Sequence, residues 1–152
     1  MLRQRLKDAL TEAMKSKDTH SLRTLRLILA ALKDRDIAAR PSGNTDGIDV
    51  DDILSMLQSM IKQRHDSIEM YQQGGRQELA DTEQQEILII EQFLPRQFSD
   101  SEIDDAVAGI ITDLGATCIK DMGKVMGALK AKYAGQMDFG KASKVVKDRL
   151  AS

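Results

Sequence analysis

Apolar residues recur at helical spacing along almost the whole length of this chain. The first segment has a Leu or Met at every fourth position from Leu2 to Met14, and six later segments repeat a three- or four-residue spacing. No stretch alternates between polar and apolar residues for long enough to form a strand. The pattern therefore predicts an all-α fold.

Breaks in this periodicity mark the ends of seven expected helices. We expect the second helix over roughly residues 20–39, followed by a loop rich in Pro, Gly and Asn at residues 40–47. The Gly-Gly pair at residues 74–75 ends the third helix, and Gly115 ends the fifth. The later helices begin at residues that can cap an N-terminus: Asp49, Ser99 with Glu102 as a capping box, Asp121 and Asp138.

Pro95 divides the chain into two parts. The residue before a proline resists the helical conformation, so the fourth helix ends at Leu94. We expect residues 1–95 to form an N-terminal domain that resembles a four-helix bundle, and residues 98–152 to form a small three-helix domain. Each part then needs a hydrophobic core of its own.

The counts of reactive and metal-binding residues exclude several classes of protein. The single cysteine, Cys118, rules out an intramolecular disulfide and a thiolate zinc cluster, and two histidines argue against a histidine-rich metal site. We therefore expect no metal and no cofactor. We expect Cys118 to be a small apolar side chain, at least half buried, rather than a nucleophile.

Signatures of catalysis and of membrane insertion are also missing from the sequence. Lys124 follows Gly123, but the other positions that a phosphate-binding P-loop needs hold Cys118 and Val125. No run of about 18 apolar residues is present to span a membrane, and the N-terminus lacks a continuous apolar signal region. We expect a cytoplasmic protein with no membrane association and no catalytic residues of its own.

Five charged residues fall on the apolar faces of the expected helices. They are Arg26 and Lys33 on the second helix, Arg64 on the third, and Glu83 and Glu86 on the fourth. The glycine turn between the third and fourth helices brings Arg64 level with the two glutamates. This cluster is either an acid–base or substrate site, or an interhelical ion-pair network that fixes register. Opposite charges at matching levels favour the network, because unpaired buried charge is costly.

The last two helices combine lysines with small residues on their outward faces. Each glycine inside a helix costs about 1 kcal/mol relative to alanine, which indicates that something approaches this face closely. One interpretation is a nucleic-acid backbone held by lysines. The other is a solvated lysine face with a tight helix–helix crossing at the two glycines of the sixth helix. The candidate nucleic-acid-binding residues are Lys120, Gly123, Lys124, Gly127, Lys130, Lys144 and Lys147.

The formal net charge of −2 conceals a strong asymmetry along the chain. Residues 98–119 carry five acidic side chains and no basic one, whereas residues 120–152 carry eight basic and three acidic side chains. Aromatic residues make up only 3% of the chain, which argues against a platform that stacks single-stranded bases. The last two helices are therefore expected to present a positive surface that could orient a polyanion.

Several runs of sequence resemble the YqeY family. They are TLRLILAALKDRDI at residues 24–37, QRHDSI at 63–68, GRQELA at 75–80, FLPRQ at 93–97 and DMGKVMG at 121–127. The resemblance covers essentially the whole chain in the same order, and DMGKVMG is its most specific part. Asp36 departs from the expected Glu, and His65 replaces a more usual charged residue.

The resemblance implies both a fold and a function. YqeY proteins share their domain with the C-terminal tail of the GatB subunit of glutamyl-tRNA(Gln) amidotransferase, which implies a helical N-terminal bundle followed by a small three-helix domain. In that enzyme the tail helps to hold the tRNA while the chemistry lies elsewhere. The label often attached to the family, carbon–nitrogen ligase with glutamine as amido-nitrogen donor, is then inherited from the shared domain.

Three hypotheses follow for this chain. The first is a free-standing helical module that binds tRNA or a tRNA-handling enzyme and has no catalytic activity of its own. The second is a protein-interaction module that docks on an amidotransferase or an aminoacyl-tRNA synthetase, and RNase-resistant capture of such a partner would support it. The third is glutamine-dependent amidotransferase activity, which predicts ammonia release from glutamine by the purified protein.

Overall fold

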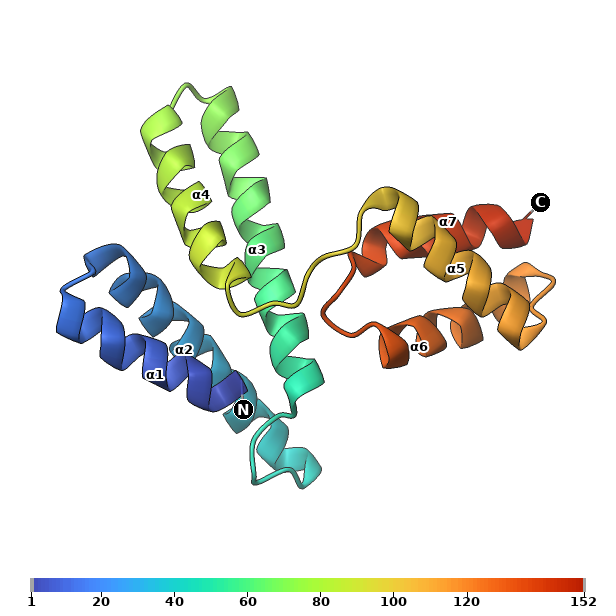
Figure 1. Cartoon of the computed structure of the whole chain (residues 1–152), viewed down its shortest axis with the longest axis horizontal. Coiled ribbons are helices and arrows are strands. Elements are labelled where there is room, and N and C mark those ends of the chain that lie inside the picture. Colours follow the sequence, from blue (N-terminus) through green and yellow to red (C-terminus); the bar gives the residue numbers. More distant parts are fainter. Residues whose placement is uncertain (1, 152) are drawn as a thin grey trace. The chain divides into compact units, whose positions relative to one another are not determined.

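The computed structural model describes residues 2–151, which contain seven α-helices, two short 3₁₀ turns and no strand (Figure 1). The all-α prediction is therefore confirmed. In chain order the helices are α1 (Leu2–Ser16), α2 (Thr19–Ala39), α3 (Val50–Gln73), α4 (Gln77–Glu91), α5 (Asp100–Leu114), α6 (Met122–Lys132) and α7 (Phe139–Ala151). The 3₁₀ turns are η1 (Arg40–Ser42), after α2, and η2 (Ile119–Asp121), before α6.

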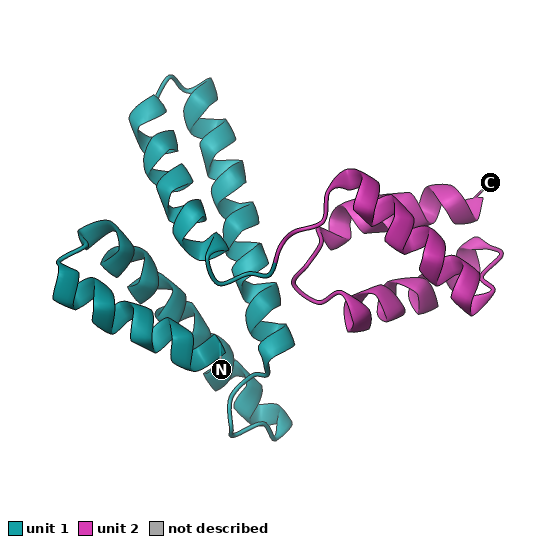
Figure 2. Ribbon diagram, viewed as in Figure 1, with its two compact units in different colours: residues 1–95 teal, residues 96–152 magenta. Residues whose placement is uncertain are grey.

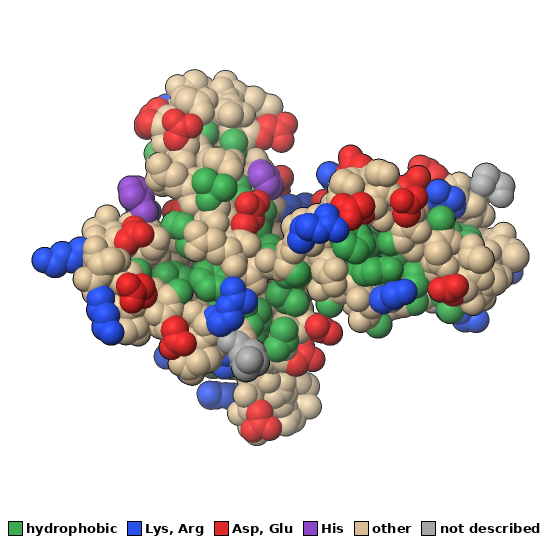
Figure 3. Space-filling model, in the orientation of Figure 1, with side chains coloured by type: hydrophobic (Ala, Val, Ile, Leu, Met, Phe, Trp, Pro, Cys, Tyr) green, Lys and Arg blue, Asp and Glu red, His purple; other side chains and the backbone are tan. Residues whose placement is uncertain are grey.

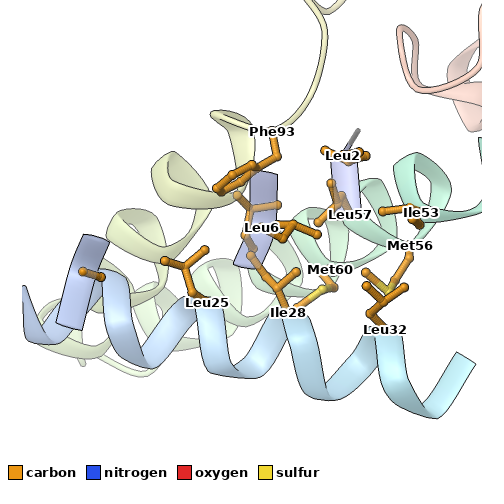
Figure 4. Close-up of a cluster of buried hydrophobic side chains, with 12 residues drawn as sticks. Leu2, Leu6, Leu25, Ile28, Leu32, Ile53, Met56, Leu57, Met60 and Phe93 are labelled. Carbon is orange, nitrogen blue, oxygen red and sulfur yellow. The ribbon is translucent and has the colours of Figure 1, made fainter. Parts of the chain in front are cut away.

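The chain divides into two compact units, residues 1–95 and residues 96–152 (Figure 2). Unit 1 holds two helical hairpins, α1–α2 and α3–α4, and α2 also packs against α3 and α4. Its core draws on all four helices, and Leu6, Ile28 and Leu57 are completely buried in it (Figure 4). Burial of apolar side chains at helical spacing is thus what joins the two hairpins.

Hydrogen bonds among Arg3, Asp36 and Ile48 link α1, α2 and the loop between α2 and α3, and we call them the clasp. Arg3 on α1 donates to both carboxylate oxygens of Asp36 on α2, at 2.6 and 3.0 Å, and also to the carbonyl oxygen of Ile48. Asp36 in turn accepts from the backbone N–H of Ile48. Gly47 lies against this clasp with a φ of +97°, and a Cβ there would come within 2.7 Å of Arg3 Nη2. Asp36, the departure from the YqeY pattern, therefore has a structural role.

Unit 2 consists of helices α5, α6 and α7. The residues just before α5 are held by hydrogen bonds to the first turn of that helix. The Ser99 hydroxyl accepts from the backbone N–H of Glu102, and the Glu102 carboxylate accepts from the backbone N–H of Ser99, so the expected capping box is present. Arg96 donates to both oxygens of that carboxylate. Gly115 ends α5, as expected, and its backbone adopts the left-handed conformation. Val107, Val125, Leu129 and Val146 are fully buried in the core between the helices.

Two expectations about the turn before α6 need correction. Cys118 is exposed, not half buried, because it lies in the outward connection between α5 and η2. Asp121 stands at the N-terminus of α6, but its carboxylate does not cap that helix. It accepts instead from the backbone N–H groups of Thr117 and Cys118, which closes the preceding turn and lowers the pKa of Asp121.

Candidate nucleic-acid interface

Helix α6 separates its apolar and polar residues onto opposite faces. Val125 and Leu129 are fully buried against the rest of unit 2. Lys124 and Lys130 are exposed, and so are the two glycines of the helix, Gly123 and Gly127. The outward face of α6 therefore consists of lysines separated by residues with no side chain.

Open space lies outward of the two α6 glycines. A Cβ built at Gly123 or at Gly127 would meet no atom within 4 Å. No other helix of unit 2 packs on this face, so the tight helix–helix crossing considered for these positions is not present within unit 2. Packing in the described residues does not account for two glycines whose replacement by alanine would favour the helix by about 1 kcal/mol each.

Helix α7 adds Lys144 and Lys147, and the turn η2 adds Lys120. All three are exposed, and η2 contacts both α6 and α7, so the lysine-bearing segments belong to one packed unit. We call these three residues together with Lys124, Lys130, Gly123 and Gly127 the lysine–glycine surface. The structure places all seven on the surface of unit 2.

The lysines of this surface lie outside the ion pairs of the described residues, although the charge of Lys124 helps to lower the pKa of the neighbouring Asp121. Two other cations of α7 pair with α5: Lys141 with Asp100 at 3.3 Å, and Arg149 with Asp104 at 3.1 Å. None of the ion pairs among residues 2–151 includes a lysine of the lysine–glycine surface. The acids of α5 thus engage two neighbouring cations and leave these lysines available for an external anion.

The polar cluster of unit 1 has a different character. Arg64 on α3 donates from Nε to Glu86 at 2.9 Å and from Nη1 to the Met60 carbonyl, and its Nε lies 4.0 Å from Glu83. Burial and the nearby Glu86 raise the pKa of Glu83. Every buried side-chain N or O atom in the described part of the chain has a hydrogen-bond partner. Arg64, Glu83 and Glu86 thus form an interhelical ion-pair network, as the second interpretation of this cluster predicts.

Arg26 and Lys33 do not join that cluster. Both are exposed, and neither takes part in an ion pair of the described residues, so their assignment to the apolar face of the second helix was wrong. The buried stripe of α2 contains Leu25 and Leu32, each one residue earlier and therefore 100° away around the helix. The two cations therefore lie outside the buried stripe, on the solvent-facing side of α2.

The described residues offer neither a metal-binding cluster nor a membrane-spanning helix. Residues 2–151 contain no group of three or more His, Cys, Asp or Glu side chains placed to hold a metal ion. No helix in the described part of the chain is both long and apolar enough to cross a bilayer.

Comparison with known proteins gives a consistent family match. Residues 3–150 match the family described as "Yqey-like protein". "Altered inheritance of mitochondria protein 41, mitochondrial" from Lachancea thermotolerans is 34% identical over 72% of this chain, and the protein of that name from Vanderwaltozyma polyspora is 32% identical over 77%. The chain spans only 57% and 64% of the length of these two relatives. The protein of the same name from Pyrenophora tritici-repentis is 30% identical over 84% of this chain and 71% of the relative's own length.

Proposed function

This chain belongs to the YqeY-like protein family, and from that premise we propose that it is a helical module that binds tRNA without catalysing a reaction itself. The observation that supports the proposal is the lysine–glycine surface of unit 2. There, two exposed helical glycines on which no other part of unit 2 packs are interspersed with lysines that form no ion pair among residues 2–151.

The chemistry of this surface suits a phosphate backbone. Lysine ammonium groups contact phosphates without reading sequence, and such contacts position a protein on a nucleic acid. Glycines at 123 and 127 would let the backbone come closer to α6 than alanine would. Tyr133, the tyrosine of unit 2, is edge-on to Phe98 at 5.1 Å and is half buried, so stacking on bases has no part in the proposal.

The choice of tRNA rests on the likeness to the tRNA-holding tail of GatB. The names of the curated relatives mention mitochondria, which is a statement about those proteins. Cytoplasmic location of this chain and its docking on an amidotransferase or synthetase remain predictions.

The proposal can be tested with two variants that lose the same charge. One carries Lys124, Lys130, Lys144 and Lys147 changed to Gln; the control carries the same change at the exposed unit 1 residues Lys7, Lys15, Lys17 and Lys62. Filter binding to a tRNA transcript at low salt should show a large loss for the first variant and little for the control. Absence of binding by the wild type, or equal losses in the two variants, would overturn the proposal.

A further inference from the structure

Helix α2 presents a basic stripe that neither the core nor the lysine–glycine surface uses. Arg26 and Lys33 lie on it with Arg23 before them and Arg40 after them, and all four side chains are exposed. Their spacing of three or seven residues keeps them on one face of the helix. We call these four residues the α2 stripe. Sequence reasoning missed Arg23 and Arg40, although the spacing was a visible signal.

The backbone keeps these residues in line. Arg40 caps α2 with φ −59° and ψ −43°, so the helical geometry continues through it. Arg26, Lys33 and Arg40 follow one another at intervals of about 10.5 Å along the axis, and the stripe from Arg23 to Arg40 is about 25 Å long. A straight row of cations of this length matches an extended anion better than a compact one.

The acids around the stripe leave its charge largely uncompensated. Asp34 is exposed on the same helix, while Asp36, which faces Arg40, is held by Arg3. On the packed helices, Glu83 of α4 faces Arg23 and is itself engaged by Arg64. No ion pair among residues 2–151 includes a member of the stripe. In the view of Figure 3, Lys and Arg side chains are interspersed with Asp and Glu over the α1–α2 hairpin, whereas Asp and Glu predominate at the tip of α3–α4.

The composition of the stripe favours a phosphate backbone over a membrane or a protein. Three of its four cations are arginines, whose planar guanidinium groups bind phosphate through two hydrogen bonds. Leu27 and Ile37 are the large apolar side chains exposed on α2, at 43% and 44%, and the apolar face of the helix is already buried in unit 1. A helix that inserts into a lipid surface needs that face free. No aromatic residue lies on α2 to anchor a protein partner.

We infer that the α2 stripe is a second phosphate-backbone contact, so that both units hold the same RNA. The inference rests on the proposed function of unit 2 and extends it to unit 1. Two basic surfaces joined by one chain bind an RNA that reaches both of them more tightly than either surface would alone.

The test uses the full chain and three variants measured against a tRNA transcript by fluorescence anisotropy over a range of KCl concentrations. The stripe variant changes Arg26, Lys33 and Arg40 to Gln, and the matched control changes Lys7, Lys15 and Lys62. The third is the unit 2 lysine variant described above. All of these side chains are exposed and outside the ion pairs, so the fold should be kept, which circular dichroism and thermal unfolding would verify.

We expect the stripe variant to lose at least about tenfold in affinity at low salt and to reduce the slope of log affinity against log salt by about 2 to 3, while the control changes little. If the stripe variant binds tRNA as tightly as the control variant does, while the unit 2 lysine variant binds more weakly than wild type, this inference alone would be overturned. No binding by the wild type would overturn the proposed function as well. Stripe-dependent binding to phosphatidylserine vesicles, with RNA affinity unchanged, would replace the RNA backbone by a lipid surface.

Discussion

The guanidinium Nε of Arg64 on α3 lies 2.9 Å from Oε2 of Glu86 on α4, and both side chains are nearly buried, at 12% and 11% exposure. Replacing Arg64 by Met leaves two carboxylates without their cation, so we expect a loss of about 3 kcal/mol in the free energy of unfolding. Changing Glu86 to Leu in the same protein should recover part of that loss. Urea denaturation measures the free energy of unfolding of both variants. If the Arg64→Met variant is no less stable than the double variant, Arg64 and Glu86 are not coupled.

The clasp at Arg3 predicts a difference between two glycines with nearly the same positive φ. Gly43 and Gly47 have φ values of +95° and +97°, but only a Cβ at Gly47 would meet other atoms. Gly43→Ala should cost about 1 kcal/mol from backbone strain. Gly47→Ala should cost about 1 kcal/mol more, because the new methyl group displaces Arg3 from Asp36. The excess should vanish in an Arg3→Met background; an excess that persists there would mean that the clasp is not its cause.

The capping box of α5 predicts a pH dependence of stability. The hydrogen bonds from Arg96 and from the Ser99 backbone lower the pKa of Glu102 from 4.5 to about 2. The ionised carboxylate therefore stabilises the fold fully above pH 4.5, and this contribution is lost as the pH falls toward 2. The difference in unfolding free energy between wild type and Glu102→Gln should be constant near neutral pH and shrink across that window. A difference independent of pH would contradict the assignment.

The exposed glycines of α6 predict that stability and binding change in opposite directions. Alanine at Gly123 and Gly127 meets no atom, so each change should raise the unfolding free energy by about 1 kcal/mol. The same changes should weaken tRNA binding, because the methyl groups keep the backbone away from α6.

Gly109 on α5 supplies the control for this experiment, because it too is exposed within a helix and has nothing within 4 Å. Gly109→Ala should stabilise the protein equally and leave binding unchanged. Binding that is insensitive to alanine at 123 and 127 would remove the argument for close approach.

Local signals in the sequence predicted much of the fold. Asp49 caps α3 through the backbone N–H of Asp52, and the Gly-Gly pair at 74–75 separates α3 from α4, because these effects depend on neighbouring residues alone. The pairing of Arg64 with Glu86 also follows from the sequence, since an antiparallel hairpin with a short turn fixes which residues stand level.

Features that depend on tertiary packing could not be predicted in the same way. Arg26 lies 100° around the helix from a buried residue. Whether a side chain at such a position is buried or exposed depends on how closely the neighbouring helices approach. The link from Arg3 to Asp36 joins residues 33 positions apart, which no periodicity indicates. The open space around Gly127 likewise depends on how the helices of unit 2 pack, which the sequence does not show.

The salt dependence of tRNA binding by the full chain tests the central claim most directly. Four phosphate contacts from Lys124, Lys130, Lys144 and Lys147 predict a slope of about −3 to −4 in log affinity against log salt, more negative still if the α2 stripe contributes. Changing the four lysines to Gln should make the slope less steep by about 3 to 4. A wild-type slope near zero, or one that the four substitutions leave unchanged, would contradict the account.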